Sequence, residues 1–144
     1  MQSGTGSPGR LVIDSIGAQV SVTHLGGLTH ATTISTGTGS GTGGTPTATV
    51  GSGSTDLSGY FSITTGTTCD PDANIITMTY NTAYSTVPKS VTITPANKAA
   101  RNLAVGQQPF ASRALQTASQ LILTSNTTPL ADATTYEFYY TVIQ

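Results

Sequence analysis

Charged side chains are scarce in this chain, and their scarcity argues against several classes of function. Only 8% of the 144 residues are Asp, Glu, Lys or Arg, against about 25% in an average domain. Electrostatic binding of nucleic acid needs clustered Lys and Arg, whereas the net charge here is −1. Four of the five basic residues are spread over positions 89 to 113, and such a spacing is typical of solvated charges in loops: Lys89, Lys98, Arg101 and Arg113. We therefore expect no nucleic-acid partner.

Cysteine and long apolar runs are also lacking. Cys69 is the single cysteine, so no disulfide can form within the chain. This usage fits assembly in a reducing cytoplasm or indifference to redox state, and such a cysteine is typically a small buried hydrophobe. No stretch approaches the about 18 apolar residues of a membrane span, and MQSGTGSPGR at the start has no apolar signal region. We expect a soluble protein without a membrane partner.

Recognisable catalytic and metal-binding patterns are missing as well. His24 and His30 flank LGGLT at a spacing that matches no zinc signature. Asp70 and Asp72 in CDPDAN favour a turn, with their side chains capping local backbone, over a calcium loop. Cys69 has no His or Asn arrangement typical of a nucleophile. The sequence therefore predicts no enzyme and no metal site.

One glycine pattern formally matches a dinucleotide-binding fingerprint. Gly39, Gly41 and Gly44 in GSGTGG have the spacing G-x-G-x-x-G. The fingerprint requires a helix that starts at the loop and holds the pyrophosphate at its N-terminus, but Thr45, Pro46 and a further Gly/Ser run follow. A chance match is expected in so glycine-rich a tract. No nucleotide or other cofactor is predicted.

The polar residues that are present are mostly Thr, Ser, Gly and Asn, and they favour β-structure. Thr is β-branched and suits a pleated surface. A chain of 144 residues can bury about 68–70% of its unfolded surface, which is enough for one core without metal or disulfides. The composition therefore predicts an all-β domain with a neutral, hydroxyl-covered exterior.

Alternating apolar residues mark the expected strands. In YSTVPKSVTITPAN, Val91 and Ile93 alternate with Ser and Thr between Pro88 and Pro95, which set the two ends of a strand. Further strands are expected in YFSITT, NIITMTYN and QLILT, with the inward positions Phe61, Ile63, Ile76, Met78 and Tyr80. The Ala-rich stretches NKAARNLAVG and ASRALQTASQ favour short helical turns. Strands at this spacing predict an antiparallel β-sandwich, jelly-roll-like in connectivity.

The last segment, TTYEFYYTVIQ, has the strongest alternation. One face carries Tyr136, Phe138, Tyr140 and Val142, and the other carries Glu137, Tyr139, Thr141 and Ile143. Because the outer face of a monomeric sandwich should be polar and solvent-exposed, Tyr139 and Ile143 are expected to be covered by either a second subunit or a loop. The sequence alone leaves both alternatives open, and Tyr139 and Ile143 are the candidate subunit interface.

Three zones are expected along the chain. Residues 1–36 form an N-terminal arm with short β segments, in RLVID (Leu11, Val12, Ile13) and in AQVSVTHL (Val20, Val22). Residues 37–59 are a Gly/Ser/Thr-rich linker or long turn. Residues 60–144 form the β-sandwich head.

The order of three stretches resembles a known family. GTPTATVGSGSTDLSGYFSITTGT is followed by ANIITMTYNTAYSTVPKSVTITPANKAA and then by ADATTYEFYYTVIQ. Over residues 45 to 144 this order is similar to the β-sandwich head domains of bacteriophage tail-fibre and virion-surface proteins, with TPAN and YYTVI as the more specific elements. The resemblance implies a homotrimeric, non-enzymatic protein displayed on the virion, where such proteins bind host surfaces or reinforce the capsid.

A capsid decoration, or cement, protein is the favoured function within that family. Fibres that carry such heads normally place a long shaft before them, whereas only residues 1–36 precede the Gly-rich stretch and they contain no heptads. The arm, with Leu11, Val12, Ile13, Val20 and Val22 as docking residues, would bind the major capsid protein or clasp a neighbour by adding a strand to a sheet edge. The expected location is the capsid exterior, after assembly in the host cytoplasm.

The alternative is an adhesin, a short tail-fibre or head-fibre tip that recognises a glycan on the host cell. Sugar sites usually combine exposed aromatic rings with polar side chains. The candidates are Tyr60, Tyr84 and Tyr139, with Asn81 and Asn97 near them in the sequence. Each of these residues also fits a purely structural role, either packed in the core or placed in a turn.

Overall fold

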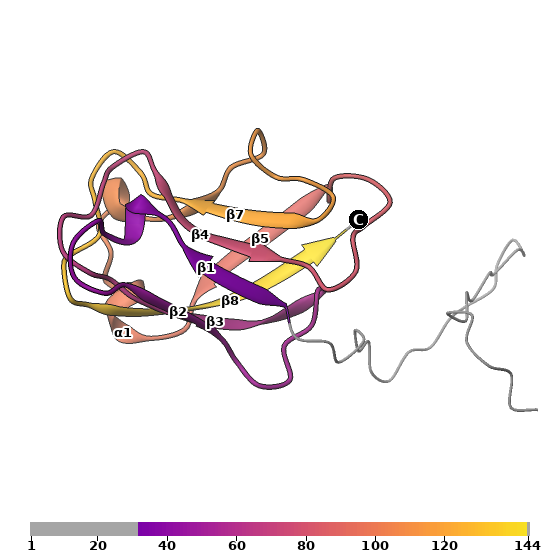
Figure 1. Ribbon diagram of the computed structural model, residues 1–144, viewed down its shortest axis with the longest axis horizontal. Helices are drawn as coiled ribbons and strands as arrows, with labels where there is room; N and C mark the ends of the chain where they lie inside the picture. Colours follow the sequence, from indigo (N-terminus) through magenta and orange to yellow (C-terminus); the bar gives the residue numbers. More distant parts are fainter. Residues whose placement is uncertain (1–31, 144) are drawn as a thin grey trace, which may run out of the picture.

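Strand β8 (Thr135–Ile143), the segment with the strongest alternation in the sequence, lies inside a sheet between β3 (Ser58–Thr64) and β5 (Ser90–Pro95). The structure is a computed structural model that describes residues 32–143 (Figure 1). The remaining strands are β1 (Thr33–Thr36), β2 (Thr47–Val50), β4 (Asn74–Thr79), β6 (Phe110–Ala111) and β7 (Gln120–Thr124). Three short helical segments complete the elements: η1 (Thr38–Ser40), α1 (Lys98–Arg101) and η2 (Val105–Gln107).

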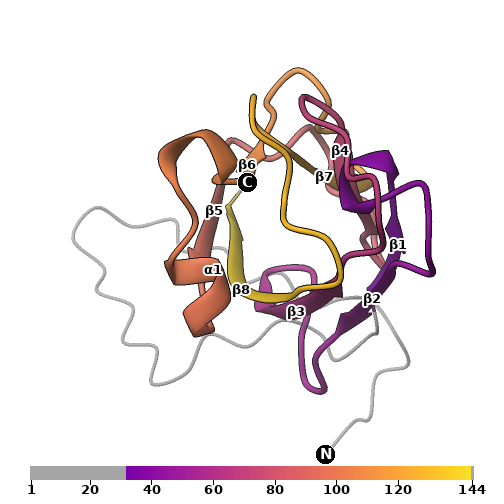
Figure 2. The same cartoon turned by 90° about the vertical axis from the view of Figure 1, so that its left-hand side faces the viewer.

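The strands form two antiparallel sheets that pack face to face. Their orders are β1-β4-β7-β6 and β2-β3-β8-β5, and the end-on view shows the two sheets enclosing the interior (Figure 2). The predicted all-β antiparallel sandwich is therefore confirmed. The finer expectation of a jelly-roll connectivity is not confirmed by these strand orders.

The core is built around aromatic rings from β3 and β8. Phe61 and Phe138 are cross-strand partners, and their ring centroids lie 5.7 Å apart. Tyr140 lies 6.1 Å from Phe61, and all three side chains are buried. Each such ring contributes roughly 1.5–3 kcal/mol by leaving water, so this cluster holds the two sheets together. The inward positions predicted in the last strand (Tyr136, Phe138, Tyr140, Val142) are all buried, as expected.

Strand β4 departs from simple alternation. Ile76, Met78 and Tyr80 are buried as predicted, but Ile75 is fully buried too. The register with β7 shifts between Asn74 and Ile76. A bulge of this kind breaks the period of two, so adjacent residues can both pack into the core.

The sandwich starts earlier in the chain than the sequence suggested. β1 lies within the expected arm, and β2 lies within the expected linker of residues 37–59. The glycine-rich segment before β2 is fixed by backbone hydrogen bonds, among them Gly37 N to Ile75 O (2.8 Å) and Thr67 N to Gly43 O (2.7 Å). A Cβ on Gly37 would lie 2.3 Å from Asn74 O, so glycine is required for this close approach. The tract is therefore part of the fold.

The segment between β5 and β6 contains the helical turns predicted for NKAARNLAVG, whereas ASRALQTASQ, which follows the start of β6, forms turns but no helical element. Asn97, at the end of TPAN, caps α1: its side-chain oxygen accepts a hydrogen bond of 2.9 Å from the N–H of Ala100. The strand before it, β5, ends at Pro95 as predicted, with Val91 and Ile93 half-buried. Within residues 32–143 no helix has the length and apolar character that crossing a membrane would require.

Candidate functional site

The outer face of the sheet β2-β3-β8-β5 is the candidate functional surface, and we call it the tyrosine face. Strand alternation directs hydroxyl side chains outward along all four strands. The outward residues are Thr47, Thr49, Ser58, Tyr60, Ser62, Thr64, Ser90, Thr92, Thr94, Thr135, Glu137, Tyr139, Thr141 and Ile143. Glu137 is the one charged side chain among these residues. The face is therefore nearly neutral and rich in hydroxyl groups.

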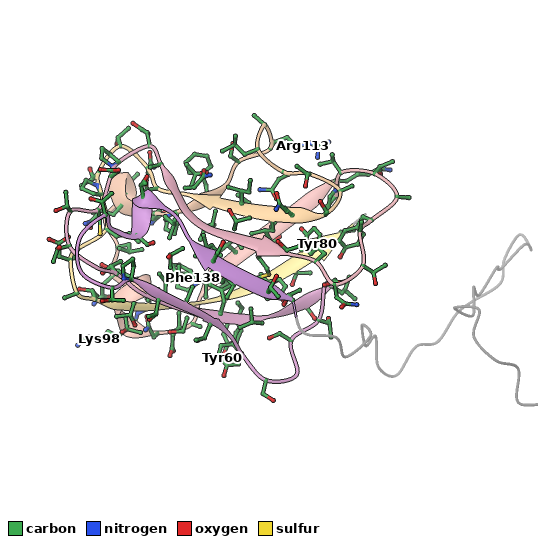
Figure 3. All side chains as sticks on the ribbon, viewed as in Figure 1. Tyr60, Tyr80, Lys98, Arg113 and Phe138 are labelled. Atoms are coloured by element: carbon green, nitrogen blue, oxygen red, sulfur yellow. The ribbon has the colours of Figure 1, made fainter. Side chains whose placement is uncertain are left out.

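Two tyrosines lie side by side on the tyrosine face. Tyr60 of β3 and Tyr139 of β8 are cross-strand partners, and their side chains are 42% and 56% exposed. Ile143, further along β8, is 55% exposed. Figure 3 shows the contrast between Tyr60 on the outside and Phe138 between the sheets. Large apolar and aromatic groups thus remain uncovered in the middle of a sheet.

Gly51 positions the ring of Tyr60. The N–H of Gly51 donates to Tyr60 O at 2.9 Å, which continues the β2–β3 pairing beyond Val50. A Cβ at position 51 would lie only 1.9 Å from Cε1 of Tyr60. The tyrosine ring therefore lies directly on the glycine backbone, and any larger residue at position 51 would displace it.

A shallow hollow of about 360 Å³ lies between the two tyrosines and the loop that joins β2 to β3. Its lining consists of Ser52, Gly53, Ser54, Ser58, Gly59, Tyr60, Tyr139, Tyr140 and Thr141. Hydroxyl groups beside aromatic rings can bind a polar, uncharged partner by hydrogen bonds and stacking. The lining contains no acid or base for proton transfer.

Asp56 fixes the loop that forms this hollow. Its carboxylate accepts hydrogen bonds from the N–H groups of Asn81 (2.8 Å) and Thr82 (2.9 Å). The Tyr84 hydroxyl donates to the backbone oxygen of Asp56 at 2.8 Å, and the Tyr140 hydroxyl donates to the backbone oxygen of Thr55. Charge-assisted bonds of this length are among the stronger ones in proteins, so two distant loops are held as one unit.

Burial keeps the tyrosines under this loop protonated. It raises the pKa of Tyr84 from its ordinary value of 10.0 to about 12, and the nearby Asp56 charge acts in the same direction. Burial also raises the pKa of Tyr80 and of Tyr140. The rings of Tyr80 and Tyr84 meet edge to face, with centroids 4.9 Å apart. The hydroxyl groups of Tyr84 and Tyr140 thus remain hydrogen-bond donors at neutral pH.

The residues predicted from the sequence fall into three groups. Tyr139 and Ile143 are exposed together on β8, and Tyr60 joins them. The side chains of Tyr84 and Asn97 form structural hydrogen bonds, and the exposed side-chain amide of Asn81 donates to the Thr82 hydroxyl at 3.3 Å. Leu11, Val12, Ile13, Val20, Val22, His24 and His30 lie outside the described residues. Sequence reasoning assigned no site role to Asp56 or Gly51, because their contacts depend on strand register and on a loop 25 residues away.

Among residues 32–143, the groups considered for metal binding or catalysis are not assembled into a site. No cluster of three or more His, Cys, Asp or Glu side chains is present in residues 32–143. Asp72 lies in the predicted turn, with a positive φ of 50° and its N–H donating to Asn126 O. Cys69 is buried as predicted, and burial together with Asp132 raises the pKa of its thiol to about 11. A thiol protonated to that extent is a poor nucleophile.

Comparison of the chain with protein-family models, with curated proteins and with solved structures gave no match.

Proposed function

We propose that this chain is a non-enzymatic structural protein of a bacteriophage virion: a homotrimeric decoration protein that binds the major capsid protein and stabilises the outer capsid surface. The observation that carries the proposal is the tyrosine face. Tyr60, Tyr139 and Ile143 are exposed there together on a rigid sheet with almost no charge. The resemblance of residues 45 to 144 to phage head domains supports the assignment to a virion.

A face of this kind is suited to permanent assembly. Removing Ser and Thr hydroxyls from water costs much less than removing charges, and tyrosine is enriched in the central parts of protein interfaces. Exposed apolar groups gathered on one face typically mark such an interface. In the proposed trimer, the side chains of Tyr139 and Ile143 pack against a neighbouring copy, and this contact would cover the outer face of β8.

Docking, on the capsid or as a clasp on a neighbouring subunit, is assigned to residues 1–36, as the sequence suggests, with Leu11, Val12, Ile13, Val20 and Val22 as the docking residues. The sandwich would then project outward and present a neutral surface with few Lys and Arg residues. Because proteases such as trypsin cleave after Lys and Arg, a surface poor in both suits a particle that is exposed outside the cell. The proposed location is the capsid exterior, with assembly in the host cytoplasm.

The test uses capsids that lack this protein. The purified full-length chain is added back, and the temperature at which the capsids release their contents is compared with that of undecorated capsids. We expect saturable binding at regular lattice positions and a higher release temperature. Gold-labelled antibody on intact virions should mark the whole capsid. Label at the tail alone, with no effect on capsid stability, would contradict the proposal.

A second candidate is favoured by the hollow beside Tyr60 and Tyr139. Aromatic rings next to Ser52, Ser54 and Ser58 could bind the ring and hydroxyls of a neutral glycan, as in an adhesin at a fibre tip. This function predicts saturable binding of the chain to host cells, lost in Tyr139→Ala and in Tyr60→Ala. Cell binding without capsid binding would favour the adhesin over the decoration protein.

A further inference from the structure

A hollow with mainly apolar residues in its lining and two cations on its rim lies at the edge of the sandwich, away from the tyrosine face. The hollow measures about 200 Å³ and lies between β5, β8 and the segment from α1 to Pro109. Its lining consists of Ile93, Pro95, Ala100, Arg101, Leu103, Gln108, Pro109 and Phe138. Figure 2 shows α1 beside β5 and β8, where this hollow lies. A branched aliphatic side chain placed in it would reach Phe138 of the core.

The rim of the hollow carries two cations. A neighbouring depression is lined by Pro95, Ala96, Asn97, Lys98 and Arg101, so Pro95 and Arg101 belong to both. Lys98 and Arg101 are exposed, and neither forms an ion pair with any residue in the described part of the chain. Two free cations beside an apolar hollow favour a ligand that has an aliphatic group followed closely by a carboxylate.

The chain itself contains such a ligand. Leu11-Val12-Ile13-Asp14 is an apolar run that ends in an acid, and Asp14 is the one Asp or Glu side chain outside residues 32–143. Within the described residues, Asp56 is bound to Asn81 and Thr82. Glu137 lies beside Ala96, whose N–H donates to Glu137 O at 2.8 Å, but it forms no ion pair with Lys98 or Arg101 in the described part of the chain. The apolar residues of this segment thus match the lining of the hollow, and the carboxylate of Asp14 matches the cations on its rim.

The chain between residues 14 and 32 is long enough to bring this segment to the hollow of a neighbouring subunit. From Ile13 to Thr32 the chain spans up to about 60 Å when extended, whereas a strand of nine residues such as β8 is about 30 Å long. β1 begins at the end of the sandwich where β8 ends, and α1 lies at the other end (Figure 1). A segment that leaves one subunit near Thr32 can therefore cross the length of the subunit beside it.

We propose that the hollow between β5 and α1 receives the segment Leu11–Asp14 of a neighbouring copy of this chain, with Ile13 in the hollow and Asp14 on Arg101 and Lys98. This inference rests on the self-assembly in the proposed function and adds a second contact between subunits. Exchange of identical segments would pair Asp14 of every subunit with the cations of its neighbour.

A charge swap tests the contact in the full-length chain. Arg101→Glu should weaken self-association about fivefold, as measured by sedimentation velocity over a concentration series, because an attractive pair becomes repulsive. Adding Asp14→Arg to that variant should restore the association. Arg113→Glu is the matched control, because it makes the same charge change away from both the hollow and the tyrosine face and should leave association unchanged. Failure of the double variant to recover would overturn the proposal.

A pair of cysteines identifies the subunit that supplies the segment. Ile13→Cys and Gln108→Cys, introduced together, keep Asp14 and Arg101 in place, and Cys69 is buried. On mild oxidation we expect covalent oligomers on a denaturing gel, which neither single variant gives. A disulfide within one chain, or none, would overturn the proposal.

A capsid-binding measurement distinguishes failure of this inference from failure of the proposed function. A chain that decorates capsids and self-associates, but fails the charge-swap and cysteine tests, would overturn this inference and leave the proposed function standing. A chain that passes the charge-swap and cysteine tests but binds no capsid would sustain this inference and sink the proposed function.

Discussion

The hydroxyl of Tyr84 donates a hydrogen bond of 2.8 Å to the backbone oxygen of Asp56, and the carboxylate of the same aspartate binds the N–H groups of Asn81 and Thr82. The loop before β3 and the loop after β4 are thus joined from both sides. The loop before β3 forms one wall of the hollow beside Tyr60. The geometry of the tyrosine face therefore depends on a carboxylate that does not itself belong to that face.

Replacement of Asp56 should destabilise the protein. In Asp56→Ala the N–H groups of Asn81 and Thr82 lose their acceptor, and we expect a loss of about 1–3 kcal/mol in the free energy of unfolding. Urea denaturation followed by tyrosine fluorescence measures this change. Asp72→Asn, which removes a negative charge from an exposed turn, is the control and should change the free energy little. Equal effects of the two substitutions would contradict the structural role of Asp56.

Gly51→Ala should disturb the tyrosine face while sparing the fold. The new Cβ would meet the ring of Tyr60, an exposed side chain that can rotate away, so we expect a stability change within about 1 kcal/mol. Displacement of the ring should weaken self-association about fivefold or more, as measured by sedimentation velocity. Ser52→Ala, in the same loop, should leave association unchanged. A Gly51→Ala protein that associates normally would show that the position of the Tyr60 ring does not matter for assembly.

The exposed part of β8 should determine the oligomeric state. Tyr139→Ser with Ile143→Ser removes two side chains that are more than half exposed, so the fold should persist while self-association falls by about 100-fold. Leu115→Ser removes an apolar side chain that is 41% exposed, outside both the tyrosine face and the hollow, and it serves as the control. Light scattering distinguishes a trimer from a monomer. A double variant that remains trimeric would exclude these residues from the subunit interface.

Stability should fall in alkaline solution. Burial raises the pKa of Tyr84 to about 12 and that of Cys69 to about 11, and it raises those of Tyr80 and Tyr140 as well. A raised pKa means that the folded state holds its proton more tightly than the unfolded state. The resulting stabilisation is complete below the ordinary pKa values of 9.0 and 10.0 and is lost as the pH rises through the folded-state values.

Urea denaturation between pH 8 and pH 12 measures this loss. Tyr84→Phe removes one of the titrating groups, so the free energy of unfolding of this variant should fall less steeply with pH than that of the parent chain. A free energy that stays constant from pH 9 to pH 12 would contradict the expectation.

The sequence predicted the fold where side-chain alternation is clean. Apolar residues recur with a period of two in β5 between its prolines, at Phe61 and Ile63 in β3, and along the whole of β8. Packing of one strand face against a single core produces this period. β1 and β2 were assigned to an arm and a linker because they lie in a tract of Gly, Ser and Thr. Their pairing depends on backbone contacts such as Gly37 with Ile75, which a short-range pattern does not contain.

Only part of the candidate site was predictable from the sequence. Tyr139 and Ile143 stand out in the sequence because they are large apolar groups on the outward side of a strand. The contribution of Gly51 becomes visible only through strand register, and that of Asp56 only through a loop contact. The cations Lys98 and Arg101 were interpreted as solvated loop charges. The hollow beside them forms only when the segment after β5 folds back against Phe138.

The position of β8 at the centre of its sheet also bears on how the protein is synthesised. β3 and β5 flank β8 and do not pair with each other, so the sheet lacks its middle strand until residues 135–143 have left the ribosome. Up to that moment β3 and β5 are open edges with apolar inner faces, which are prone to pairing with other chains. Synthesis of β8 therefore completes the sheet, and the facing edges of β3 and β5 stay open to pairing with other chains until that strand has emerged.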